Sequence, residues 1–166
     1  MMNRNGLKTL SVIAAILLVF VCTETGSAQR VPRREARGRA WTKAEVKTVI
    51  SRVEDRVDRF IKRYDEALDR SGLDKTNRED WLMKRARDLE TATDELSREF
   101  DRRDAWVENK DETRKCLDIA TSIDVNMRRF SYTKEAEQNW ANVRFELNTL
   151  ADIYNLPKVG SGAYKP

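Results

Sequence analysis

The feature that most constrains the fold is a spacing of apolar residues that recurs along the chain after residue 41. In two segments, residues of core type step by 4, 3, 4, 3 and 4 positions. This period places every apolar side chain on one stripe of an α-helix, and a helix with one apolar stripe must bury it against other helices. The spacing therefore predicts an all-α fold. The two stripes are Leu82, Ala86, Leu89, Thr93, Leu96 and Phe100, and Ala136, Trp140, Val143, Leu147, Leu150 and Tyr154.

Capping residues divide the first half of this region into two helices. Thr42 and Glu45 have the spacing of a capping box, and we expect the first helix over 42–70, with Gly72 as a left-handed stop. Thr76 and the glutamate three residues later repeat the spacing at the start of the second helix. The stripe of the first helix contains Val46, Val49, Ile50, Val53, Val57, Phe60, Ile61, Tyr64 and Leu68.

The second half of the region predicts two more helices. The third begins either at Asp104 or at Asn109, where Glu112 offers a second capping box; the fourth follows residues 131–133 and ends at Pro157. The stripe of the third contains Trp106, Thr113, Leu117, Ala120, Ile123 and Met127. Short links force sequential helices to run antiparallel. We therefore expect an up-down-up-down four-helix bundle over 41–156, built from two helical hairpins with coiled-coil-like packing. A flexible tail over 157–166 is expected either to lie over the surface or to stay mobile.

The N-terminus has the pattern of an export signal. Basic residues precede an apolar run over 10–22, which is too short to span a membrane, and small residues then precede a cleavage position after Ala28. Residues 1–28 are therefore expected to be a signal peptide, and the protein to be periplasmic or secreted. The alternative is a lipoprotein anchored through Cys22, although the residue before it, Val21, is not small as a lipobox requires.

Residues 29–40 form an Arg-rich segment without apolar periodicity, which we expect to be a disordered arm. We expect this arm to be a solvated linker, and the alternative is weak contact with an anionic lipid, a cell-surface polymer or nucleic acid. Residues 41–166 contain 25 basic and 26 acidic residues, so the basic charge of the whole chain does not predict sequence-specific nucleic-acid binding by the bundle. The candidate binding residues of the arm are Arg30, Arg33, Arg34, Arg37 and Arg39.

The residue types restrict the chemistry. The chain has no histidine, which removes the usual proton shuttle and the commonest metal ligand. After cleavage Cys116 would be the only cysteine, and its place beside a helical stripe predicts a buried thiol; an intermolecular disulfide or a reactive thiol is the alternative. The acidic clusters at 54–58 and 94–95 lack an EF-hand spacing, and the apolar stripes contain no acid. We therefore expect no enzyme activity, no catalytic or metal site and no cofactor.

The high content of charged residues is explained by the outer faces of the helices. An acid precedes a base by four positions at eight places, an order that stabilises an exposed helix by ~0.2–0.5 kcal/mol per pair. These faces are expected to be solvated. The pairs are Asp55/Arg59, Asp58/Lys62, Glu66/Arg70, Asp80/Lys84, Asp94/Arg98, Glu99/Arg103, Asp111/Lys115 and Asp124/Arg128.

Each of the four tryptophans lies near the start of a different predicted helix. Antiparallel packing would bring Trp41 and Trp106 to one end of the bundle, and Trp81 and Trp140 to the other. We expect these indoles to seal the ends of the core, and the alternative is that Trp81 and Trp140 line an aromatic pocket that binds a ligand.

Four stretches of the sequence resemble a group of uncharacterised exported bacterial helical proteins. They are VEDRVDRF at 53–60, ALDRSGLDKTNRED at 67–80, DLETATDEL at 88–96 and YNLP at 154–157. The resemblance implies export and an all-helical fold, and it carries over no activity, cofactor or catalytic residue, because none is known for the group. From the residues we expect a non-enzymatic structural or interaction module with an unknown protein partner in the cell envelope. The alternative is a ligand-binding or chaperone-like module that uses the arm or an aromatic end of the bundle.

Overall fold

The computed structural model of the chain describes residues 41–161. The predicted signal peptide, the Arg-rich arm with its five arginines, and residues 162–166 lie outside the described residues. The predictions for these segments are therefore not addressed by the structure. In the described range, no helix is long and apolar enough to cross a membrane.

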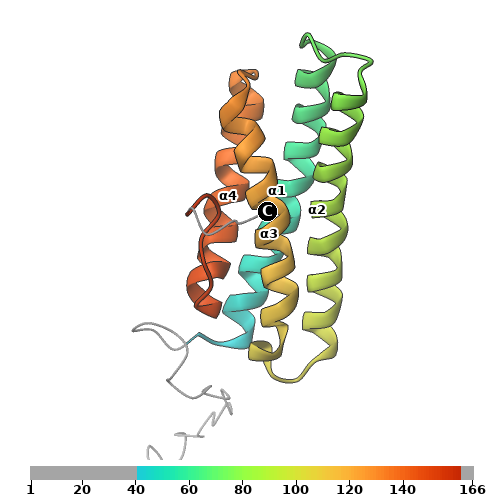
Figure 1. The fold of residues 1–166 in the computed structure, drawn as a ribbon. Helices are drawn as coiled ribbons and strands as arrows, with labels where there is room; N and C mark the ends of the chain where they lie inside the picture. The colour runs from blue at the N-terminus through green and yellow to red at the C-terminus, as the bar shows by residue number, and fades with distance from the viewer. Residues whose placement is uncertain (1–40, 162–166) are drawn as a thin grey trace, which may run out of the picture.

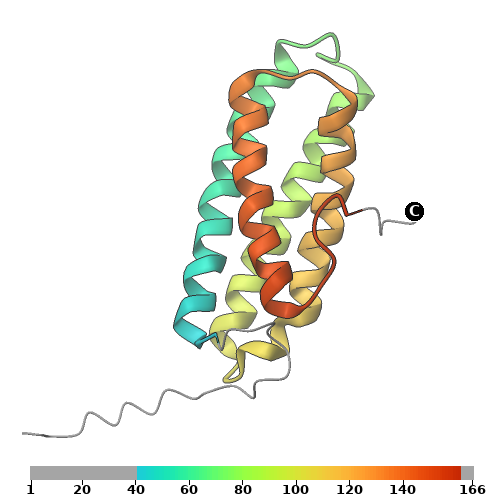
Figure 2. The ribbon, with the colours of Figure 1, turned by 90° about the vertical axis from the view of Figure 1, so that its left-hand side faces the viewer.

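The described residues form an antiparallel four-helix bundle without a strand, as the stripes predict (Figure 1). The helices are α1 (Lys43–Asp69), α2 (Asn77–Arg102), α3 (Lys110–Arg129) and α4 (Lys134–Tyr154), and a short 3₁₀ turn, η2 (Trp106–Asn109), precedes α3. The α1–α2 and α3–α4 links lie at the same end of the bundle, which we call the upper end (Figures 1 and 2).

Each helix packs against two neighbours. α1 lies between α2 and α4, and α3 completes the square against the same two helices. Nearly all the stripe residues are buried, because the stripes of the four helices face one shared core. Ile61 is the exception, since it is only partly buried at the edge of the core. The prediction that each helix buries its apolar stripe in a shared core is thus confirmed.

The predicted span of α1 is confirmed, and only the role of Gly72 as its left-handed stop is wrong. Thr42 and Glu45 form both hydrogen bonds of the capping box. Gly72 is not left-handed, because the last turn of α1 is closed instead by Ser71, whose backbone N–H and hydroxyl both donate to Leu68 O at 2.9 and 2.7 Å. The left-handed residue of this link is Lys75, at φ 60°.

The starts of α2 and α3 differ from the predicted capping boxes. Thr76 caps α2, but Glu79 Oε2 accepts from Lys75 N at 2.6 Å and not from the cap residue. Asp104 does not cap α3, which begins only after the η2 turn. Asn109 occupies the cap position without a side-chain cap bond; its Oδ1 accepts from Arg103 Nη1 and its amide donates to Trp106 O, both at 3.3 Å.

Helix α4 ends at Tyr154, and its C-cap, Asn155, is left-handed with φ 52°. The chain then turns back along the bundle, so residues 157–161 of the predicted tail lie against it (Figure 2). Val159 is buried, and its backbone N–H donates to Asn148 Oδ1 at 2.8 Å. Lys158 Nζ also lies 2.8 Å from Asp152 Oδ2, which ties this segment to α4.

Candidate functional site

Two carboxylates lie within the bundle, which contradicts the prediction that the apolar stripes are free of acids. Asp124 on α3 and Glu146 on α4 are each 1% exposed. Each directly neighbours a stripe residue in the sequence, Ile123 and Leu147 respectively. The stripes are therefore wider than their apolar members, and acids occupy their edges.

Asp124 binds three donors. Its Oδ1 accepts from Trp140 Nε1 and from Arg144 Nη1, both at 3.0 Å, and its Oδ2 lies 2.7 Å from Arg128 Nη2. Gly160 covers the site from the C-terminal segment, since a Cβ on this residue would lie 2.6 Å from Asp124 Oδ2. The predicted Asp124/Arg128 pair thus exists, but the expectation that it is a solvated surface pair is wrong for its carboxylate.

Glu146 joins α4 to α1. Its Oε1 lies 3.0 Å from both Arg52 Nε and Arg56 Nη2. Arg56 also donates to the carbonyl oxygen of Asn142 at 3.1 Å. The second carboxylate oxygen of Glu146 is buried and has no hydrogen-bond partner among the described residues. Both buried acids therefore lie at helix interfaces and face arginines.

Other predicted acid–base pairs are formed only in part. Besides Asp124/Arg128, the described residues include ion pairs at Glu66/Arg70, at 3.5 Å, and at Glu99/Arg103, at 3.4 Å. Two lysines pair with acids other than the predicted ones. Lys84 pairs with Asp88 in its own helix, and Lys115 pairs with Glu95 across the α2–α3 interface.

Trp81 and Trp140 differ in burial, and they do not line the aromatic pocket that was the alternative to end-sealing. Trp140 lies inside the bundle, where its ring centroid is 5.0 Å from that of Phe60 and its N–H binds Asp124. Trp81 lies at the surface and is 38% exposed. End-sealing is borne out at the other end for Trp106, which is buried against Tyr154 with a centroid distance of 5.4 Å.

Trp81 lies between two arginines of its own helix. The guanidinium carbon of Arg78 is 4.7 Å from the indole centroid and that of Arg85 is 5.5 Å from it. Arg78 also reaches the ring of Phe130 at 5.8 Å, and its Nη2 donates to Asn126 Oδ1 at 2.6 Å. We call Arg78, Trp81, Arg85 and Phe130 the Trp81 surface. Among the predicted candidates, only Trp81 presents an aromatic face that a ligand or partner can reach.

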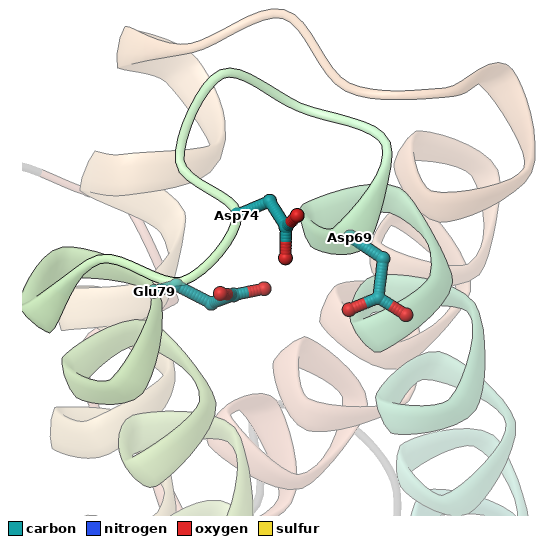
Figure 3. Close-up of side chains that lie close together, drawn as sticks. All are labelled: Asp69, Asp74 and Glu79. Atoms are coloured by element: carbon teal, nitrogen blue, oxygen red, sulfur yellow. The ribbon is translucent and has the colours of Figure 1, made fainter.

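Three acids outside the predicted clusters meet around the α1–α2 link (Figure 3). Carboxylate oxygens of Asp69, Asp74 and Glu79 all lie within 4.8 Å of one another, and oxygen ligands suit hard cations. However, Lys75 already supplies positive charge, since its Nζ lies 3.6 Å from Asp74 and its backbone N–H binds Glu79. Because exposed acids with a lysine among them need no ion, we assign no metal to this cluster.

Cys116 is buried, as predicted. Burial raises the pKa of its thiol to about 12, so the thiol is neutral at physiological pH. A neutral, buried thiol is neither a nucleophile nor a metal ligand. The reading of Cys116 as a packing residue is therefore favoured over that of a reactive group.

The chain matches no family model, and neither curated proteins nor solved structures gave a match. The resemblance to exported helical proteins thus stays a prediction.

Proposed function

We propose that this protein is an exported, non-catalytic helical bundle that binds a protein partner in the cell envelope through the Trp81 surface. The observation that carries the proposal is the exposure of Trp81, a large apolar side chain placed at the upper end between two arginines. Tryptophan and arginine are the residue types most enriched among those that dominate protein–protein binding energy.

The contacts of the Trp81 surface hold it ready for binding. Arg78 is fixed by Asn126 and stacks on both Trp81 and Phe130, so little side-chain freedom remains to be lost on association. A partner that covers the indole would bury part of its ~150–250 Å² of surface. An apolar partner residue flanked by acids is complementary to an indole between guanidinium groups.

The surroundings of the buried acids and of the cysteine argue against a catalytic role for these groups. Asp124 and Glu146 are buried and each faces two arginines, and the thiol of Cys116 is neutral. A general acid or base must reach substrate, and these groups are enclosed by the protein's own side chains. Export rests on the predicted leader. The alternative of ligand binding through the arginines of the arm stays a prediction.

The test is affinity capture from the envelope fraction of the native cell, with wild-type protein compared with two variants. Trp81→Ala removes the indole, and Phe145→Ala is the matched control, because Phe145 is a 64% exposed aromatic residue on another helix. We expect one partner to be retained by wild-type and by Phe145→Ala and to be lost with Trp81→Ala. Partners lost equally with both variants, or retained by both, would refute the assignment of the surface.

A further inference from the structure

A second charged surface lies between α1 and α4, at the upper end of the bundle. It is a groove of about 730 Å³, within the size range of small-molecule sites. We call it the α1–α4 groove. Its lining residues are Arg59, Lys62, Arg63, Glu66 and Arg70 on the α1 side and Thr133, Glu135 and Asn139 on the α4 side.

The groove is positively charged because the buried acid of the α1–α4 interface lies lower on the bundle than the groove. Lower on the interface, Arg52 and Arg56 have Glu146 as a carboxylate partner. One turn of α4 higher, the interface offers Asn142, which accepts from Arg56 through its carbonyl oxygen, and then Asn139. The basic residues of α1 above Arg56 therefore have no buried acid of α4 like Glu146 opposite them.

Within the groove, one carboxylate forms ion pairs with two guanidinium groups. Glu66 Oε2 lies 2.9 Å from Arg63 Nη1 and 3.5 Å from Arg70 Nη2. Arg59 uses its Nε to bind the backbone oxygen of Asp55 at 3.0 Å, and Lys62 has no ion pair within the described part of the chain. Four basic side chains thus face two acidic ones, Glu66 and Glu135.

The start of α4 faces the same groove. Thr133 is the N-cap of α4, and its side chain satisfies the backbone N–H of Ala136. The helix dipole places partial positive charge at this end, but Glu135 and Glu137 in the first turn offset it. The positive charge of the groove therefore comes from its four basic side chains.

We propose that the α1–α4 groove binds a phosphate-bearing ligand. Guanidinium groups recognise phosphate oxygens in a bidentate way, and each bond to a charged oxygen is stronger than a neutral hydrogen bond. The shared chemistry is a phosphate group, which a soluble diphosphate or a phospholipid headgroup can supply. This site is separate from the Trp81 surface, which lies on the α2–α3 side of the bundle.

The test compares two double variants of the full chain that remove the same charge. Arg59→Gln/Arg63→Gln alters the groove, and Arg87→Gln/Arg98→Gln alters two exposed arginines of α2. Sodium pyrophosphate is titrated by ¹⁵N NMR, with the side-chain amide of Asn139 as the local reporter. Vesicles with and without phosphatidylglycerol form the second arm. Melting curves establish that each variant is folded.

We expect pyrophosphate to shift the Asn139 amide and the groove variant to weaken binding at least about tenfold, with the α2 variant close to wild-type. Glu135→Gln should strengthen binding, because it removes an acid from the groove. Binding of pyrophosphate alone would identify a soluble ligand, whereas additional groove-dependent binding to the anionic vesicles would identify a headgroup. Equal loss in both double variants, or no shift at Asn139, would overturn the proposal.

Discussion

Removing the carboxylate of Asp124 should destabilise the bundle mainly through one neutral donor, the indole N–H of Trp140. The two arginines at this site have exposed side chains, at 60% for Arg128 and 38% for Arg144, so water replaces the carboxylate for them. The indole N–H has no such replacement, because Trp140 is buried.

The expected free energies follow from this difference. Asp124→Asn keeps an oxygen that accepts from Trp140 and loses two screened ion pairs, which together contribute about 1–2 kcal/mol. Asp124→Ala loses the same pairs and also leaves a buried donor unpaired, at a further cost of about 1–3 kcal/mol. The alanine variant should therefore be less stable than the asparagine variant by about 1–3 kcal/mol.

Urea unfolding followed by circular dichroism measures these differences, with Asp118→Ala as the control for losing an exposed acid of the same helix. A double-mutant cycle with Trp140→Phe isolates the indole, since phenylalanine has no N–H. Trp140→Phe should cost less in the Asp124→Ala background than in wild-type. Equal stabilities of the alanine and asparagine variants, or a cycle without coupling, would refute this explanation.

Two further predictions concern the C-terminal segment and the α1–α2 interface. Gly160 has φ 76°, so Gly160→Ala should destabilise residues 157–161 by more than about 1 kcal/mol. Tryptic cleavage after Lys158 should therefore become faster. Gly72→Ala is the control, because a Cβ at Gly72 meets no atom within 4 Å, and it should leave that cleavage unchanged. Burial raises the pKa of Glu54, Asp94 and Asp58 raise it further, and Ser97 and Lys47 lower it in part. Because the folded-state pKa lies above the unfolded one, ionised Glu54 opposes folding above this pKa, and the penalty disappears as the pH falls through it. Glu54→Gln should therefore raise the urea midpoint near neutral pH, by less than about 1 kcal/mol in stability, and lose this advantage below pH ~4; an advantage that persists in acid would contradict this account.

The fold was predictable because the information is local and periodic. The steps from Leu82 to Phe100 and from Ala136 to Tyr154 fix one buried face per helix, and short links leave few ways to join four such faces. The helix boundaries were less predictable, because alternative local bonds compete. Ser71 closes α1 without help from Gly72, and the amide of Asn109 binds Trp106 O and does not cap α3.

The sites were less predictable because they depend on contacts between distant segments. Asp124 has the spacing of a surface pair with Arg128, and only the packing of Trp140 and the return of the chain at Gly160 enclose it. Trp81 and Trp140 start helices at the same end, yet sequence position does not reveal which indole turns inward. The α1–α4 groove combines the bases of one helix with two neutral side chains and one acid, Glu135, from the α4 side. The sequence of α1 shows its basic residues, but it does not show which residues of α4 lie opposite them.

The bridge between Arg52 and Glu146 also bears on the order in which the bundle assembles. The two residues are separated by 94 positions, whereas each helical hairpin is joined by a link of a few residues. Closing a loop of this length costs about 4 kcal/mol in chain entropy, which neither hairpin turn must overcome. The α1–α4 interface is therefore the helix contact with the largest cost in chain entropy, and at this interface the first and last helices share a buried carboxylate that two arginines bind.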